Sequence, residues 1–129
     1  MVKNILAVDD EFDDLLAIKQ ALEKEGFVVI PATNGAKALE MLKSADFDLV
    51  LIDILMPTVS GYTLLNMLRE ITGTKTKMMY ISILPEKEVD KDGIDGFIQK
   101  PFSANILLKK VKEALKNKKQ GLTKKKKRK

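Results

Sequence analysis

The stretch that decides the fold is Val50-Leu51-Ile52-Asp53-Ile54-Leu55-Met56-Pro57-Thr58-Val59-Ser60-Gly61. Residues 49–52 are all apolar, which is typical of a strand buried on both faces of a parallel sheet. Asp53 ends this run, so we expect its carboxylate where the strand leaves the sheet. Pro57 prevents a helix here, because it has no N–H and restricts the residue before it. Residues 60–61 then predict the start of a helix over residues 62–70.

The same alternation of strand and helix runs outward in both directions. Apolar runs predict strands over residues 2–8, 27–30, 47–53, 78–82 and 96–99. Helix starts are predicted at residues that cap helices well, namely Asp13 or Asp14, Asn34, Ser60 and Ser103. Helices are predicted to end at Gly26 and near Gly73. The pattern predicts an α/β fold with five parallel strands and helices on both faces of the sheet, joined by right-handed crossovers.

Two of the predicted helices differ in how clearly the pattern supports them. In the last helix, apolar residues recur at helical spacing and predict its buried face: Ile106, Leu107, Val111 and Leu115. Residues 85–95 form the least helical segment, because only Val89 and Ile94 interrupt its charges. Pro85 fits a first helical turn, so we still expect a helix there.

Composition excludes several classes of function. The 129 residues include no cysteine and no histidine, which removes disulfides, thiol chemistry, Ser-His-Asp triads and His-ligated zinc. Carboxylates, lysines and hydroxyls remain, and oxygen ligands favour ions such as Mg²⁺. The first apolar run is short and is followed by acids, so we expect no signal peptide and no transmembrane segment. A soluble, cytoplasmic protein with one domain is therefore expected.

Charge is distributed unevenly along the chain. The net charge is +5, but residues 116–129 contain nine Lys or Arg and no acid, which leaves residues 1–115 with a net charge of −4. We expect residues 119–129 to form a basic, disordered tail, because like charges with little to bury cannot offset the entropy of ordering. The tail could make a weak contact with polyanions, although a merely solvated chain end is an equally good interpretation.

Acidic, hydroxyl and lysine side chains stand at the ends of four of the predicted strands. In a parallel sheet the strand ends meet at one edge, which would bring together Asp9, Asp10, Asp53, Ser82 and Lys100. Three carboxylates so close repel one another unless a divalent cation or a lysine neutralises them. Ser82 and Lys100 could each contact a phosphoryl oxygen.

Each of these residues also has an ordinary structural interpretation. Asp9 and Asp10 could cap a helix, Ser82 could be a satisfied strand-end hydroxyl, and Lys100 could be solvated. Phe97 is more often a core residue than a switch. Asp53 is harder to explain in this way, because an acid after four apolar residues needs a partner.

Four motifs, in order, resemble the receiver domain of two-component response regulators. They are Ala7-Val8-Asp9-Asp10-Glu11, Leu51-Ile52-Asp53-Ile54-Leu55-Met56-Pro57 with Gly61, Ile81-Ser82, and Gly96-Phe97-Ile98-Gln99-Lys100-Pro101-Phe102. The resemblance runs from about Lys3 to Lys118. It implies a receiver domain over residues 1–118 with a flavodoxin-like, doubly wound (βα)5 fold and strand order 2-1-3-4-5.

The resemblance also implies a role for each site residue. Asp53 would accept a phosphoryl group from the phosphohistidine of a sensor histidine kinase or phosphotransfer protein. Mg²⁺ would be held by Asp9, Asp10, Asp53 and the backbone carbonyl of Leu55. Ser82 and Lys100 would contact the phosphoryl group, and Ser82 and Phe97 would form the switch to an unknown downstream target. Such a protein is not an enzyme in the usual sense, because it catalyses only its own phosphoryl transfer and dephosphorylation.

Two features depart from the family pattern. Ile83 stands where the family commonly has a small residue, so its side chain could crowd the phosphoryl site. The span from Ser82 to Lys100 is about one helical turn shorter than usual. The contacts that members of the family make with their downstream targets are therefore not assigned to residues of this chain.

We interpret the chain as a stand-alone receiver, and two alternatives remain open at this stage. One is a receiver-like binding module that does not use phosphorylation. The other is a metal-dependent phosphohydrolase with Asp53 as nucleophile, which Leu55 argues against, because such enzymes usually have an acid two residues after the nucleophile.

Overall fold

Five parallel strands form the centre of the protein, as the apolar runs predict. A computed structural model describes residues 2–116, so the predicted tail over residues 119–129 lies outside the described residues. The strands are β1 (Asn4–Val8), β2 (Val28–Ala32), β3 (Leu49–Asp53), β4 (Lys77–Ser82) and β5 (Gly96–Gln99). They pair in the order β2-β1-β3-β4-β5, and every pairing is parallel. The predicted fold class and strand order are confirmed.

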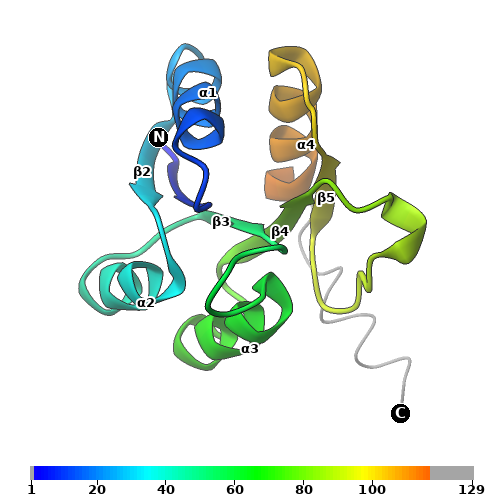
Figure 1. The fold of residues 1–129 in the computed structure, drawn as a ribbon. Coiled ribbons are helices and arrows are strands. Elements are labelled where there is room, and N and C mark those ends of the chain that lie inside the picture. Colours follow the sequence, from blue (N-terminus) through cyan, green and yellow to red (C-terminus); the bar gives the residue numbers. More distant parts are fainter. Residues whose placement is uncertain (1, 117–129) are drawn as a thin grey trace.

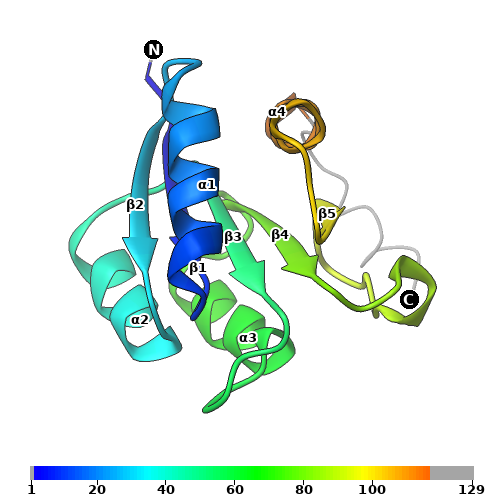
Figure 2. The same ribbon diagram turned by 45° about the horizontal axis from the view of Figure 1, so that its top comes forward.

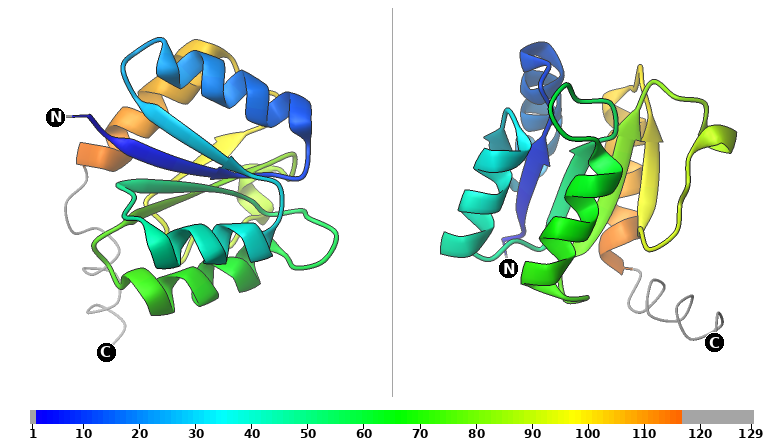
Figure 3. Two further views of the ribbon diagram at one scale, coloured as in Figure 1. Left: turned by 90° about the vertical axis from the view of Figure 1, so that its left-hand side faces the viewer. Right: turned by 60° about the horizontal axis from the view of Figure 1, so that its bottom comes forward.

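Helices cover both faces of this sheet (Figures 1 and 2). They are α1 (Phe12–Glu23), α2 (Gly35–Ser44), α3 (Gly61–Thr72) and α4 (Ala104–Lys116). Helices α1 and α4 pack on one face, and α2 and α3 pack on the other (Figure 3). No helix within residues 2–116 has the length and apolar character that crossing a bilayer requires.

Local side-chain hydrogen bonds explain where three of the helices begin. Asn34 accepts a hydrogen bond from Lys37 N at 2.8 Å, and Ser60 accepts one from Thr63 N at 3.2 Å. Ser103 accepts one from Ile106 N at 3.1 Å. These three predicted caps are confirmed, because each side chain satisfies an N–H that the first helical turn leaves free.

Two details of the first and last helices differ from the prediction. Helix α1 begins earlier than expected, with Glu11 at its N-cap position and no side-chain cap, so Asp13 and Asp14 lie inside its first turn. In α4, Ile106 is 47% exposed, and the buried residues are Leu107, Val111 and Ala114. The apolar stripe is therefore rotated away from Ile106.

The helix predicted over residues 85–95 is absent, and this prediction is wrong. The segment contains one short 3₁₀ turn, η1 (Glu86–Glu88), and otherwise runs as a loop from β4 to β5. Val89 and Ile94 are its buried apolar residues. Their spacing of five residues does not form a continuous helical stripe, and Gly93 has a φ of 78°, which no right-handed helix accommodates.

The order of the strands determines where a site can form. Chain connections run outward from β1 to β2 in one direction and from β3 to β4 and β5 in the other. Ligands of such sheets bind beyond the carboxyl ends of the strands, where the direction reverses. Val8 pairs with Ile52, so Asp9 and Asp53 leave adjacent strands at the same level of the sheet.

Candidate functional site

Three carboxylates meet at the switch point between β1 and β3. Asp9, Asp10 and Asp53 each place a carboxylate oxygen within 4.8 Å of the others. Asp9 and Asp53 are buried and Asp10 is exposed, so the cluster opens to solvent on one side. The structure therefore brings together the three acids that the strand-end argument predicted.

The backbone after β3 holds Asp53 in place. Its Oδ1 accepts a hydrogen bond from Leu55 N at 3.1 Å, and Gly61 N donates to Ile54 O at 2.7 Å. A Cβ on Gly61 would lie 2.6 Å from Asp53 O and 2.7 Å from the Ile54 Cα. Only glycine permits this close approach, which explains why glycine stands here in the deciding stretch.

Lys100 is the cation of the site. Its Nζ lies 2.9 Å from Asp9 Oδ2, 3.4 Å from Asp53 Oδ2 and 2.8 Å from Asp14 Oδ2. The side chain is 9% exposed, and the Lys100–Pro101 peptide bond is cis. One ammonium thus faces three carboxylates, which leaves the cluster with an excess of negative charge.

This excess changes the protonation of Asp53. Burial, followed by repulsion from Asp9, raises the pKa of Asp53 from 3.8 to about 7, although Lys100 and the Leu55 N–H oppose the rise. For Lys100, burial lowers the pKa, but the contacts with Asp14 and Asp9 outweigh burial and raise it overall. Lys100 therefore stays charged, but its single positive charge does not balance the carboxylates of Asp9, Asp14 and Asp53.

Asp9 has a further unsatisfied feature. Its Oδ1 accepts a hydrogen bond from Glu11 N at 2.9 Å. Its buried Oδ2 has the charge of Lys100 nearby, but within residues 2–116 no donor is aligned to give it a hydrogen bond. Buried carboxylate oxygens without donors are suited to bind a cation.

Ser82 and Phe97 lie on the neighbouring strands β4 and β5, and neither lines the opening over the carboxylates. Ser82 is fully buried, and its Oγ accepts a hydrogen bond from Leu84 N at 3.1 Å. Ser82 pairs in the sheet with Gln99, the residue that precedes Lys100 in the chain. Phe97 is 5% exposed and packs in the core on the α2 and α3 side. Their roles as switch residues remain a prediction.

An open pocket of about 250 Å³ lies over the carboxylates. We call it the acidic pocket, and it is lined by Asp10, Glu11, Asp14, Asp53, Leu55, Ile83 and Lys100. Ile83 is 66% exposed and Leu55 is 47% exposed, so two apolar side chains flank its opening. The expectation that Ile83 crowds the phosphoryl site stays a prediction.

Asp14 is the site residue that sequence reasoning assigned differently. It was expected as a possible helix cap, yet it lies in the first turn of α1 and contacts Lys100. The sequence carried no local signal for this contact, because Lys100 lies far from Asp14 in the chain and only the fold brings the two together.

The donor set fits a magnesium ion. Three carboxylates in a cluster, one of them with a buried oxygen that lacks a donor, provide hard oxygen ligands. The exposed side, at Asp10, leaves room for the water molecules that Mg²⁺ retains.

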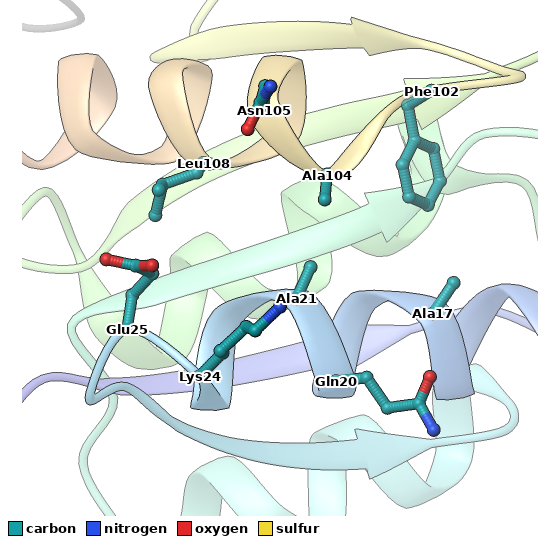
Figure 4. A pocket seen from close by; sticks show the side chains of 9 residues that line it. All are labelled: Ala17, Gln20, Ala21, Lys24, Glu25, Phe102, Ala104, Asn105 and Leu108. Carbon is teal, nitrogen blue, oxygen red and sulfur yellow. The ribbon is translucent and has the colours of Figure 1, made fainter.

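A second hollow, of about 390 Å³, lies between α1 and α4 (Figure 4). Its side chains come from both helices and from Phe102, which follows the Lys100–Pro101 turn. Small apolar residues alternate there with Gln20, Lys24, Glu25 and Asn105. The residues that line this hollow form no cluster of acids or nucleophiles.

Comparison with known proteins agrees with this geometry. Residues 5–112 match the family described as "Response regulator receiver domain". The chemotaxis protein CheY of Halobacterium salinarum is 34% identical over 118 residues, which cover 89% of this chain and 98% of that protein. The CheY of Bacillus subtilis is 36% identical over 120 residues, which cover 89% and 99%. The sensor histidine kinase CheAY of Helicobacter pylori is 33% identical over 119 residues, but this chain spans only 15% of its length.

Solved structures are similar over the same range. A CheY-like receiver domain protein from Methanospirillum hungatei has a TM-score of 0.83 at 31% identity, covering 93% of this chain and 98% of that one. The response regulator TrrA from Thermotoga maritima, in complex with Mg²⁺-BeF, has a TM-score of 0.78 at 31% identity, covering 87% and 98%. The chain therefore belongs to the response regulator receiver domain family, whose members are phosphorylation-activated signalling proteins of two-component systems.

Proposed function

We propose that Asp53 is the phospho-acceptor of this receiver and that a partner histidine kinase or phosphotransfer protein is the donor. A carboxylate oxygen of Asp53 attacks the phosphorus of a phosphohistidine, the P–N bond breaks, and the imidazole leaves as an acyl phosphate forms. The observation that carries the proposal is the cluster of Asp9, Asp10 and Asp53 within 4.8 Å, with Lys100 beside it.

Each residue then has a task that its position supports. Asp9, Asp10, Asp53 and the carbonyl of Leu55 would hold Mg²⁺, which would supply positive charge to neutralise the phosphoryl group. Lys100 lies 3.4 Å from Asp53 Oδ2, so a small movement brings its ammonium to a phosphoryl oxygen. Most of the catalytic effect comes from positioning and neutralisation of charge.

Ser82 and Phe97 connect the site to the rest of the protein. Because Ser82 Oγ accepts the Leu84 N–H, its own proton is left to donate to a phosphoryl oxygen. The movement of Ser82 would open space into which the Phe97 ring turns. A downstream target would recognise that altered state.

The same pocket accounts for the return to the resting state. Water attacks the phosphorus of the acyl phosphate, the bond from phosphorus to the Asp53 oxygen breaks, and inorganic phosphate leaves. The chain thus catalyses its own dephosphorylation but turns over no other substrate. We place this signalling in the cytoplasm, where the donor domains of sensor kinases act.

Mass spectrometry tests the proposal directly. The protein is incubated with acetyl phosphate and Mg²⁺, and we expect a phosphoryl adduct on wild type and on Asp46→Asn, but not on Asp53→Asn. Asp46 is a matched control, because its carboxylate is 92% exposed and lies outside the acidic pocket. An adduct on Asp53→Asn would assign the acceptor to another residue.

The same preparation separates the two alternatives. A phosphorylation-independent binding module would give no adduct on any variant. A phosphohydrolase would release phosphate continuously from generic phosphomonoesters, and the rate would depend on Asp53.

A further inference from the structure

Asp14 lines the acidic pocket but lies outside the cluster of Asp9, Asp10 and Asp53, and the role of Asp53 does not account for it. It lies in the first turn of α1, whose N-cap position is occupied by Glu11 without a side-chain hydrogen bond. The Asp14 side chain is instead directed to Lys100, with Oδ2 at 2.8 Å from Nζ. This is the shortest of the three contacts that the ammonium makes with carboxylates.

The three partners of Lys100 differ in depth. The side chains of Asp9 and Asp53 are 0% and 5% exposed, whereas that of Asp14 is 34% exposed. An ammonium has three N–H groups, so three carboxylates can divide it among them. Asp14 therefore attracts the ammonium from the more exposed side, and Asp9 and Asp53 attract it from the buried side.

Asp9 is the nearer of the two buried partners of the ammonium. Its Oδ2 has the ammonium at 2.9 Å but no aligned hydrogen-bond donor within the described residues. Without Asp14, the ammonium would have only the two buried acids as partners and would turn fully towards them. Lys100 and a cation would then compete for the same oxygens, because both are attracted by the same negative charge.

We propose that Asp14 is a positioning residue, which shares the ammonium of Lys100 with the two buried acids and so keeps Asp9 and Asp53 available to a divalent cation. The inference rests on the proposed metal site and adds to it a residue that acts through Lys100. Asp14 need not touch the cation. Its effect on cation binding therefore depends on the presence of the lysine.

The neighbouring residue Asp13 provides a matched control. It lies in the same helical turn and is exposed. Replacing either residue with Asn removes one negative charge near the pocket, and for an exposed carboxylate this long-range effect is screened by salt. The specific effect of Asp14 is the part that Asp13→Asn does not reproduce.

The test is Mg²⁺ affinity, measured by titration in unphosphorylated protein. We expect Asp13→Asn to weaken binding by less than about twofold and Asp14→Asn to weaken it by about fivefold to tenfold. Asp14→Glu, which retains the carboxylate, should recover most of the affinity. In a Lys100→Met background, the additional effect of Asp14→Asn should disappear, so that both Asn variants give the same small change.

A stability measurement covers variants that fold poorly. Urea unfolding in EDTA should show that the effects of Asp14→Asn and Lys100→Met are not additive, whereas those of Asp13→Asn and Lys100→Met are. Lys100→Gln replaces Lys100→Met if the latter does not fold.

The outcomes are distinct. If Asp14→Asn and Asp13→Asn weaken Mg²⁺ equally in both backgrounds, the carboxylate acts only through its charge and the inference is overturned, while the metal site stands. If wild type binds no Mg²⁺, the proposed metal site itself fails, and the positioning role fails with it.

Discussion

Replacing Asp53 with Asn should make the metal-free protein more stable, and the gain should depend on pH. Asn retains an oxygen that accepts the Leu55 N–H, which now binds Asp53 Oδ1 at 3.1 Å. It removes the charge that faces Asp9. Lys100 loses its contact at 3.4 Å with Asp53 but keeps the shorter ones to Asp9 and Asp14.

The magnitude follows from the raised pKa of Asp53, which moves from 3.8 in the unfolded chain to about 7 in the fold. Between these values the folded protein binds more protons than the unfolded one, so wild-type stability falls as the pH rises through this window. The full loss is at most about 4 kcal/mol, at about 1.4 kcal/mol per pH unit. Since the variant gives up the Lys100 contact, we expect a net gain of about 2 kcal/mol above the window.

The assay is urea unfolding in EDTA at about pH 5 and about pH 8. Asp53→Asn should exceed wild type in unfolding free energy at the higher pH, and by clearly less at the lower pH. The difference in unfolding free energy between Asp46→Asn and wild type should be the same at both pH values, because the Asp46 carboxylate is 92% exposed. Mg²⁺ should stabilise wild type and leave Asp53→Asn nearly unchanged. A difference that is the same at both pH values, or a variant that is less stable at the higher pH, would refute the reasoning.

Four further outcomes are expected. Asp10→Asn should weaken Mg²⁺ binding by about tenfold or more, since it removes the exposed ligand of the cluster; equal affinity in a titration would remove Asp10 from the metal site. Ile83→Ala should shorten the lifetime of the acyl phosphate, because a 66% exposed side chain no longer restricts water at the pocket; a decay rate no faster than that of wild type contradicts this. Arg69→Lys should lower the unfolding free energy by about 2 kcal/mol, since lysine cannot form the same set of contacts; an unchanged urea midpoint would show that these contacts contribute nothing. Deleting residues 120–129, which carry six of the basic residues, should abolish binding to heparin without changing phosphorylation; an unchanged salt dependence of heparin binding would place the contact elsewhere.

The strands and the central acids were predictable because they depend on short-range patterns. Four apolar residues before Asp53 indicate a buried strand whatever surrounds them. The convergence of Asp9, Asp10, Asp53 and Lys100 then follows from parallel topology alone, since the carboxyl ends of the strands lie at one edge. Caps such as Asn34 and Ser60 were predictable for the same reason, because each bonds within its own helical turn.

The partners of individual charges were not predictable, because they depend on tertiary distance. Asp14 looks like a helix cap in sequence, and only the position of α1 relative to the end of β5 brings it to 2.8 Å from Lys100. Arg69 is similar. Its guanidinium donates to Thr76 O at 2.8 Å, Gly93 O at 3.0 Å and Asp95 Oδ2 at 3.3 Å, which are seven to twenty-six residues away.

These long-range contacts also explain how the segment between β4 and β5 can do without a helix. Arg69 ties its end to α3, and Tyr62 OH accepts a hydrogen bond from Asp90 N at 3.2 Å. Val89 and Ile94 supply the apolar contacts that cover this side of the sheet. Because the anchors come from other elements, the segment does not need a continuous apolar stripe of its own.

The segment between β4 and β5 presents charged side chains to any partner that docks on it. Between its two buried residues, the segment exposes the charged side chains of residues 90–92, and η1 exposes three more charges immediately before Val89. A helix here would have offered a regular row of side chains at a fixed spacing. A loop held by hydrogen bonds to Tyr62 and Arg69 instead offers charge at irregular spacing. A partner that docks on this segment therefore meets a charged loop, and the contact of Arg69 with Asp95 joins α3 to the residue directly before β5.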